Sequence, residues 1–348
     1  MLIQTFLQKN NNNLDLIRII AALLVIYGHA YAISPEYGTD DIVSSILKFD
    51  YSGSLAVKIF FFISGLVVTN SLFYKKNTTD YIVSRIFRIW PALLVVVFAA
   101  YIISILITTL TIGEFFSSLN FIPYIIKSLF LQFTWDYPGV FTSNNISAFN
   151  GSLWTIPYEV SAYIILLFVA MMLRFDKLLC TIASIIIIID SSLGLGYLFT
   201  NSYFNDEVRY LPLCFSIGSL FAINKNNIEI NITSVIFGCI ILYILKLNNS
   251  IIFIPFFYFV LFYSILYISS ISMFVKLKPP HDISYGIYLW GFPVQQIIVF
   301  SIGNHGVLLN QVLSMILASI LGYLSWILIE KKSMALGKSI LFRIKGEA

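Results

Sequence analysis

Charged side chains are scarce in this sequence. Asp, Glu, Lys and Arg together make up 11% of the 348 residues, whereas a soluble domain carries roughly 25%. A hydrophobic share of 59% and a mean hydropathy of +0.88 are instead typical of a polytopic membrane protein. The net charge of +4 gives no reason to expect a nucleic-acid partner, and membrane lipids are the expected surroundings.

Cysteine and histidine are also rare, with three of each. Cys180, Cys214 and Cys239 lie in apolar segments and lack the paired spacing of a zinc site or a disulfide framework, so no metal is expected. No Walker loop and no Gly-x-Gly-x-x-Gly motif occurs, which argues against ATP hydrolysis. His281 and His305 lie beside turn residues and are expected to be solvated.

Long apolar runs are abundant. A membrane-spanning helix needs about 20 predominantly apolar residues. The sequence therefore predicts an all-α, polytopic transmembrane helix bundle of about ten spans. The predicted spans are roughly 14–33, 55–74, 86–111, 152–173, 178–198, 208–223, 231–248, 250–275, 283–303 and 307–330. The apolar segment 121–133 is too short to cross and is expected to be interfacial or re-entrant. We expect a single domain over 1–348, with its core at about 10–332 and a cytoplasmic tail at 333–348.

The distribution of Lys and Arg orients these spans. With the amino terminus inside, sixteen basic residues fall on the cytoplasmic side and five outside, in agreement with the positive-inside rule. Both termini are therefore predicted to be cytoplasmic. The two longest connections, at about 34–54 and 112–151, are predicted to be external. The first span also resembles a signal peptide with a cleavage site at Ala30-Tyr31-Ala32, although nine further spans follow it.

Two ionisable residues lie within the first predicted helix. Arg18 and His29 are eleven residues apart, so they fall within roughly 20° of one stripe and about 16 Å apart along the helix axis. Asp15 lies about 40° from that stripe, and Asn13 is a plausible N-cap. Ionisable groups at membrane depth are costly and usually face an interior cavity where they function. The pattern indicates proton transfer by a neutral imidazole combined with anion binding by a guanidinium.

Three further charged residues fit the same chemistry. Arg85 and Arg88 are three apart and share a helix face at the cytoplasmic end of the third span. Arginine forks bind phosphate bidentately, so this pair suits a diphosphate, although arginines at helix ends also anchor to lipid headgroups. Glu159 lies inside an apolar span and is either neutral, salt-bridged or part of a proton path. Its predicted depth is close to that of His29, which it meets only if their helices are neighbours.

Other polar residues have simpler structural interpretations. Lys58 is expected to extend to the external interface. Ser64-Gly65 is a small pair that permits close helix packing, and Ser64 has no local partner to activate it as a nucleophile. Tyr288 belongs to a segment expected at the interfacial aromatic belt. Glu330, beside two lysines, is expected to be an exposed helix end.

Five short motifs follow one another along the chain. The first is Asp15-x-x-Arg18-x-x-Ala21-Ala22 followed by Val25 and His29. The other four are Phe60-Phe61-Phe62-Ile63-Ser64-Gly65, Arg85-Ile86-Phe87-Arg88-Ile89-Trp90-Pro91, Ser152-Leu153-Trp154-Thr155 with Glu159, and Ser284-Tyr285-Gly286-Ile287-Tyr288-Leu289. Together, in this order, they resemble the membrane-bound acyltransferase family 3, a group of bacterial integral-membrane O-acyltransferases. The chain departs from the family at Trp290-Gly291, where many members carry a histidine, and at Ile19, where glycine is frequent. Some relatives carry an appended SGNH-type hydrolase domain, and none is expected here.

The resemblance implies an enzyme of the bacterial cytoplasmic membrane that moves an acyl group from cytosolic acyl-CoA, commonly acetyl-CoA, to a hydroxyl of a cell-surface glycan or a lipid-linked carbohydrate. His29 is then the general base or the acyl carrier, both of which suit a group that titrates near neutrality. The resemblance also implies that Arg18 contacts the CoA phosphate or pantetheine end, and that Arg85 and Arg88 clamp the diphosphate. Glu159 is then expected to orient or protonate His29, and Asp15 to fix Arg18. Ser64 and Tyr288 are expected to have supporting roles.

Two other classes of function are open to a polytopic membrane protein. A transporter or flippase for a glycan or solute would show inverted repeats with paired Gly- or Pro-broken helices, and none is convincing here. A polysaccharide polymerase would place its key charges in large external loops. The intramembrane histidine and the arginine pair favour the acyl-CoA enzyme.

Overall fold

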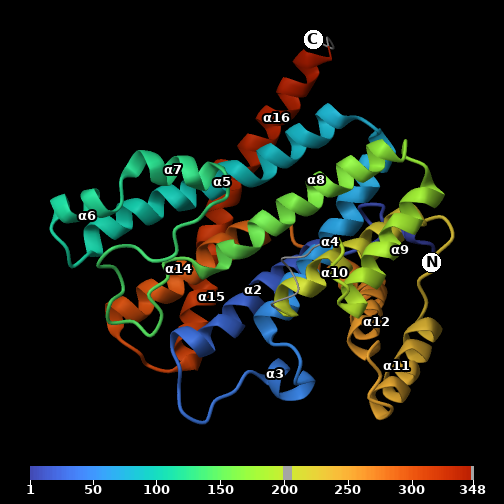
Figure 1. The fold of residues 1–348 in the computed structure, drawn as a ribbon, viewed down its shortest axis with the longest axis horizontal. Helices are drawn as coiled ribbons and strands as arrows, with labels where there is room; N and C mark the ends of the chain where they lie inside the picture. Colours follow the sequence, from blue (N-terminus) through green and yellow to red (C-terminus); the bar gives the residue numbers. More distant parts are fainter. Residues whose placement is uncertain (199–205, 346–348) are drawn as a thin grey trace. The chain divides into compact units, whose positions relative to one another are not determined.

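The computed structural model describes residues 1–198 and 206–345. Within these ranges the chain is helical and contains no strand (Figure 1). The first half of the chain contains α1 (Ile3–Phe6), α2 (Leu14–Ile33), α3 (Ile42–Leu47), α4 (Ser52–Lys75), α5 (Thr78–Ile107), α6 (Ile112–Ser118), α7 (Phe121–Leu129), the 3-10 helix η1 (Gly151–Thr155) and α8 (Ile156–Met172). The second half contains α9 (Lys177–Leu193), α10 (Asp206–Ile223), α11 (Ile232–Leu247), α12 (Phe253–Ser270), α13 (Ser272–Lys276), α14 (Ser284–Ile302), α15 (Val307–Ser325), the π-helical turn η3 (Trp326–Glu330) and α16 (Lys331–Ile344).

Seven of the described helices are long and apolar enough to cross a membrane. They are α2, α4, α5, η1 with α8, α12, α14, and the continuous run from α15 to α16. Helices also occupy the other three predicted ranges, but α9 has 17 residues, α11 has 16, and α10 carries three charged residues near its start. A multi-pass membrane protein is therefore supported. The number of ten spans and the cytoplasmic position of both termini stay predictions.

The predicted carboxy-terminal tail is helical through most of its length. The helix of α15 continues through η3 into α16, which ends at Ile344. α16 packs on α5, because a Cβ at Gly337 would lie 2.9 Å from the ring of Phe87. The Ser333 hydroxyl donates to the Phe87 carbonyl at 3.0 Å, and Lys345 pairs with Asp80 at 3.0 Å. These contacts explain why the last helix continues to Ile344, beyond the end of the apolar run at residue 330.

Packing divides the chain into two units, each assembled from three segments. Unit 1 comprises Met1–Arg18, Val57–Thr78 and Tyr158–Pro280, and unit 2 comprises Ile19–Ala56, Thr79–Pro157 and His281–Ala348. Helices α2, α4, α5 and α8 contribute residues to both units, although α5 contributes only Thr78 to unit 1. The prediction of a single domain over the whole chain stays a prediction.

In unit 1, α4 and α10 pack backbone against backbone. A Cβ at Gly65 would lie 2.1 Å from the Phe215 carbonyl oxygen, and one at Gly218 would lie 2.2 Å from that of Phe62. Small residues at such positions let membrane helices approach closely. The predicted role of the Ser64-Gly65 pair in close helix packing is therefore confirmed.

In unit 2, α14 packs along α15 and also approaches α2 (Figure 1). The approach to α2 occurs at Gly291, where a Cβ would lie 2.7 Å from Cγ1 of Ile26. In this chain a side chain there would require Ile26 to move, so glycine allows α14 to lie against the helix that carries His29.

Candidate active site

Helix α2 is the scaffold of the predicted site. It is continuous from Leu14 to Ile33, so the eleven-residue separation of Arg18 and His29 corresponds to about 16 Å along one helix. The side-chain oxygen of Asn13 accepts a hydrogen bond from the Leu16 N–H at 3.1 Å, which confirms the predicted N-cap. Asn13 also donates to the Phe274 carbonyl at 2.6 Å, which fixes the start of α2 within unit 1.

His29 is half-buried, and an aromatic contact holds its imidazole. The ring meets Phe292 of α14 edge-to-face, with centroids 5.2 Å apart and an interplanar angle of 74°. Among the described residues of unit 2, no side chain or carbonyl group hydrogen-bonds to either ring nitrogen. Packing rather than hydrogen bonding therefore sets the ring's position.

A buried amide network lies one helical turn before His29. Gln295 of α14 donates to the Ile26 carbonyl of α2 at 2.9 Å and to the Asn310 side-chain oxygen at 3.0 Å. Gln311 of α15 donates to the Tyr27 carbonyl at 3.1 Å. These bonds tie α14 and α15 to the backbone of α2. The sequence analysis did not predict this network. Its signal in the sequence is the presence of amide side chains, Gln295 in one apolar span and Asn310 and Gln311 in the next.

Tyr288 is buried, and its hydroxyl connects α14 to η1. It donates to the Ser152 carbonyl and shares a hydrogen bond with the Thr155 hydroxyl. Asn150 strengthens the junction by donating to the Leu289 carbonyl at 3.0 Å. Because η1 leads directly into α8, these bonds fix the start of the helix that carries Glu159. The supporting role of Tyr288 in catalysis stays a prediction.

Glu159 and Ser64, both predicted site residues, contact each other in unit 1. The Ser64 hydroxyl donates to Oε1 of Glu159 at 3.2 Å. Tyr163, one turn further along α8, donates to the same carboxylate oxygen and lies 3.2 Å from the Ser64 hydroxyl. Ser64 has no activating partner nearby in the sequence, because Glu159 is 95 positions away along the chain. His29 belongs to unit 2, and its pairing with Glu159 stays a prediction.

Arg88 takes part in a network with two carboxylates. Its guanidinium bonds to Asp282 at 3.1 Å and to Glu330 at 3.1 Å, and it lies 5.7 Å from the centre of the Tyr285 ring. Glu330 also accepts a hydrogen bond from Ser325 at 3.0 Å. The expectation that Glu330 is an exposed helix end was wrong, since its exposed fraction is 1%. The chain continues as a helix through Glu330, so this residue packs inside unit 2 rather than ending a helix in solvent.

The other predicted basic and acidic residues have separate surroundings. Arg85 is half-buried on α5, three residues before Arg88. Asp15 pairs with Lys278 at 3.6 Å within unit 1, and its role toward Arg18 stays a prediction. The expectation that Lys58 extends to the interface was wrong, because the residue is 2% exposed and its ammonium lies 5.3 Å from the centre of the Tyr258 ring. α4 begins at Ser52 rather than at residue 55, which places Lys58 deeper in the helix than predicted.

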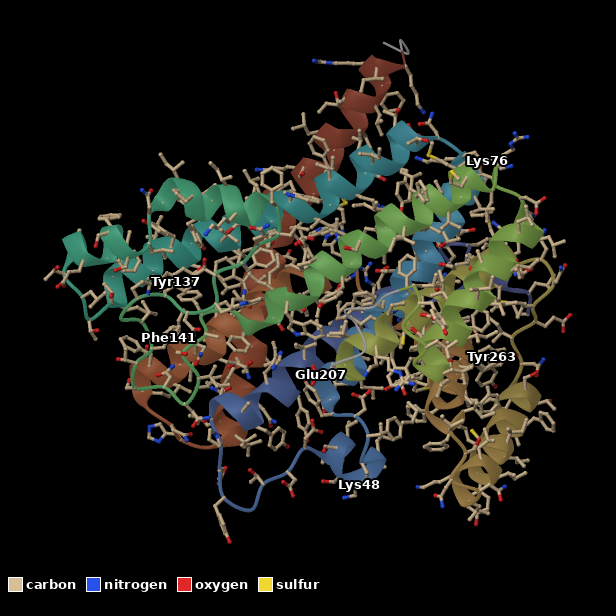
Figure 2. All side chains as sticks on the ribbon, in the orientation of Figure 1. Lys48, Lys76, Tyr137, Phe141, Glu207 and Tyr263 are labelled. Atoms are coloured by element: carbon tan, nitrogen blue, oxygen red, sulfur yellow. The ribbon has the colours of Figure 1, made fainter. Side chains whose placement is uncertain are left out.

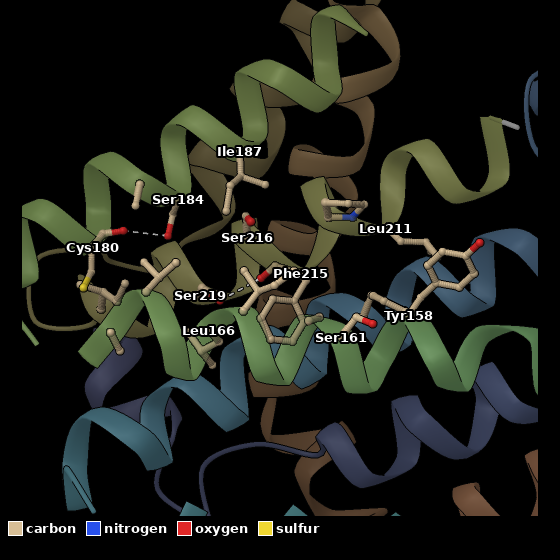
Figure 3. A pocket seen from close by; sticks show the side chains of 18 of the residues that line it. Tyr158, Ser161, Leu166, Cys180, Ser184, Ile187, Leu211, Phe215, Ser216 and Ser219 are labelled. Atoms are coloured by element: carbon tan, nitrogen blue, oxygen red, sulfur yellow. Dashed lines mark hydrogen bonds between the residues drawn. The ribbon is translucent and has the colours of Figure 1, made fainter. Parts of the chain in front are cut away.

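Unit 1 also contains an apolar cavity of about 110 Å³ between α4, α8, α9 and α10 (Figure 3). The Ser184 and Ser219 hydroxyls on its wall bond to carbonyls of their own helices, at 3.0 and 3.1 Å. Its lining is otherwise mostly aliphatic and aromatic. In the described part of the chain, no group of three His, Cys, Asp or Glu side chains is placed to hold a metal ion.

Comparison with known proteins identifies the family. The acyltransferase domain family matches residues 11–331. The chain belongs to this acyltransferase family. The O-acetyl transferase of Shigella phage Sf6 is 29% identical over 350 residues, which cover 92% of this chain and 96% of the phage protein. Nodulation protein 10 of Rhizobium leguminosarum bv. viciae is 31% identical over 163 residues, which cover 45% of this chain and 43% of that protein. No solved structure matches this chain.

The family match confirms the resemblance that the five sequence segments predicted. Together with the seven helices long enough to span a membrane, it makes this protein a multi-pass membrane acyltransferase.

Proposed function

We propose that this membrane acyltransferase moves an acyl group, most simply acetyl, from cytosolic acetyl-CoA to a hydroxyl of a cell-surface glycan or lipid-linked carbohydrate. The site of action is the bacterial cytoplasmic membrane. Similarity to a phage protein named O-acetyl transferase supports the reaction type. The structural observation that carries the proposal is His29, an imidazole on a membrane-length helix whose ring is positioned by Phe292.

His29 supplies the proton transfer in this reaction. As a general base, it takes the proton of the acceptor hydroxyl while the hydroxyl oxygen attacks the thioester carbonyl. The carbon–sulfur bond then breaks, and the CoA thiolate leaves and recovers the proton. As an acyl carrier, His29 instead accepts the acyl group on nitrogen and passes it to the hydroxyl in a second step. Both routes give the same products, an ester and CoA.

The proposed donor-binding residues are arginines. The extended pantetheine arm of acyl-CoA matches the separation of about 16 Å between Arg18 and His29 along α2. Arg85 and Arg88 supply charge for the diphosphate. At Arg88 the donor must compete with Asp282 and Glu330 for the guanidinium N–H groups.

Glu159 has two proposed roles. The first is to orient or protonate His29, as the family resemblance implies. The second follows from its contacts in unit 1, where the carboxylate accepts hydrogen bonds from Ser64 and Tyr163. In that role Glu159 holds Ser64 and Tyr163 in place, and Glu159→Gln retains part of the activity that Glu159→Ala loses.

The proposal is tested with radiolabelled acetyl-CoA and purified protein in nanodiscs, with oligosaccharides released from the surface polysaccharide of the source bacterium as acceptors. Wild type is compared with His29→Ala, and His305→Ala serves as the matched control because His305 is an exposed turn residue. We expect label transfer by wild type and His305→Ala and at least a hundredfold loss in His29→Ala, within the range of general acid–base catalysis. Equal transfer by wild type and His29→Ala contradicts the role of His29. If wild type neither binds nor turns over acetyl-CoA, the result favours the transporter or flippase.

A further inference from the structure

Unit 2 contains a polar cavity at the end of α2 that lies beyond His29. The cavity has a volume of about 500 Å³ and is lined by the end of α2 at Ile33, the loop residues 143–145, and the end of α14 at Val299 and Phe300. Its size lies within the range of about 300–1,000 Å³ that is typical of ligand pockets. We infer that this cavity holds a sugar ring of the acceptor, an inference that rests on the proposed function.

Hydrogen bonds with Gln296 of α14 fix the orientation of Asn144, the first amide in the cavity wall. Nε2 of Gln296 donates to the carbonyls of Ile146 and Ala148 at 2.7 and 2.6 Å. Carbonyl oxygens only accept hydrogen bonds, so this atom must be the nitrogen, and Oε1 of Gln296 must face Asn144. Nδ2 of Asn144 donates to that oxygen and to the Gln296 backbone carbonyl, both at 3.0 Å. Both donors of Asn144 are thus used, while its side-chain oxygen accepts no hydrogen bond from the described residues.

The same argument applies to the neighbouring amide. Nδ2 of Asn145 donates to the Ala32 carbonyl at 2.7 Å, which again leaves the side-chain oxygen without a donor among the described residues. Ser143, which also lines the cavity, is exposed. The lining residues therefore carry two amide oxygens that accept no hydrogen bond from the described residues, together with the Ser143 hydroxyl. Such a set accepts hydrogen bonds from hydroxyl groups.

An aromatic ring provides a surface of a different kind. Phe300 lines the cavity and is 41% exposed. Its ring is braced edge-to-face by Phe141 at 5.8 Å between centroids, and Figure 2 labels Phe141 on the loop between α7 and η1. A rigid aromatic face beside amide oxygens suits a sugar ring, which has an apolar C–H face and a rim of hydroxyls.

The absence of charge in the lining distinguishes this cavity from a donor site. None of the residues that line it is Lys, Arg, Asp or Glu. A nucleotide diphosphate would require cationic partners, whereas a neutral carbohydrate requires only hydrogen bonds and apolar contact. The cavity therefore fits the acceptor rather than acyl-CoA.

The cavity floor connects to the proposed catalytic residue. Ile33 and Val299 pack in one cluster with Phe292, whose ring contacts that of His29. Ile33 lies four residues after His29, on the same face of α2 and about 6 Å along its axis. The cavity wall at Ile33 is thus about one helical turn from the imidazole along α2.

Kinetics with the oligosaccharide acceptors test the site. The variants are Asn145→Ala and Phe300→Ala, with Thr142→Ala as the control because Thr142 is exposed in the same loop but does not line the cavity. Loss of one hydrogen bond costs roughly 0.5–1.5 kcal/mol, so we expect Asn145→Ala to raise the acceptor KM by about three- to tenfold. We expect the same direction for Phe300→Ala and no change for Thr142→Ala. An unchanged acceptor KM in both cavity variants, or an equal rise in the acetyl-CoA KM, overturns the inference.

A labelling measurement separates this inference from the proposed function. Asn145→Cys is introduced together with Cys239→Ser, since Cys239 is exposed whereas the other two cysteines are buried. We expect the oligosaccharides, but not acetyl-CoA, to slow maleimide labelling of the introduced cysteine. Protection without any acyl transfer by wild type supports the cavity and contradicts the proposed function. Acyl transfer without protection overturns the cavity alone, and the absence of both overturns the two together.

Discussion

The ion pairs of Arg88 lead to a prediction about stability. We expect Arg88→Met to destabilise the protein because it removes the guanidinium that pairs with the carboxylates of Asp282 and Glu330. The side chains of Arg88, Asp282 and Glu330 are 15%, 13% and 1% exposed. Solvent therefore compensates little for the lost guanidinium, least of all at Glu330.

The expected magnitude follows from the burial of this pair. Removal of one partner of a buried ion pair costs about 3–5 kcal/mol, because the remaining charge stays buried. Asp282 is slightly exposed, so solvent lowers the cost of leaving its charge without the guanidinium. We therefore expect Arg88→Met to lower the free energy of unfolding by about 3 kcal/mol. For a large chain, 1 kcal/mol corresponds to roughly 2 °C in Tm, so the expected loss is about 6 °C. Glu330→Gln should cost less, because an amide oxygen still accepts a hydrogen bond from Arg88.

The assay is thermal unfolding in detergent micelles for Arg88→Met, Glu330→Gln and the double variant. Arg343→Met is the matched control, since Arg343 is exposed on α16. We expect the double variant to lose less stability than the sum of the two single variants, as for residues in direct contact. If Arg88→Met has the Tm of wild type and changes only the acetyl-CoA KM, the reasoning is refuted and Arg88 acts as a diphosphate clamp alone.

Two further predictions concern helix packing and pH. Gly65→Ala should lower the Tm and the yield of folded protein, because the new Cβ would lie 2.1 Å from the Phe215 backbone. The control Gly113→Ala should be neutral, because no atom lies within 4 Å of the added Cβ. Equal Tm values for the two variants would contradict the packing of α4 on α10. Burial raises the pKa of Tyr137 to about 12. The folded state therefore favours the neutral phenol, and the stability this residue contributes is present below pH 10 and lost as the pH rises toward 12. Denaturant unfolding of wild type and Tyr137→Phe between pH 8 and 11.5 measures this loss, and identical pH dependence would refute it.

The correct predictions concern features that depend on residues close together in the sequence. A helix occupies each of the ten ranges that the apolar runs predict. The N-cap of α2 is also predictable, because Asn13 and Leu16, which form its hydrogen bond, are three residues apart. The errors concern side chains whose partners are distant. Arg88 is 242 positions from Glu330, so neither that ion pair nor the burial of Glu330 has a local signal.

Burial within a helix bundle was likewise difficult to predict. Lys58 was assigned to the interface from its distance to the end of an apolar run, but α4 starts before that run, and Tyr258 covers the ammonium. The amides that line the unit 2 cavity lie in a loop whose fold depends on Gln296, some 150 residues further along the chain. Periodicity identifies neither arrangement, because both arise from packing between segments.

The role of His29 is tested by a single-turnover measurement with excess enzyme and radiolabelled acetyl-CoA, in which binding and chemistry are followed separately in wild type and His29→Ala. We expect both proteins to bind acetyl-CoA with similar Kd values. We also expect that only wild type transfers label to an oligosaccharide hydroxyl at a measurable rate. Equal transfer rates in the two proteins would contradict the assignment of His29 as the group that activates the acceptor or carries the acyl group.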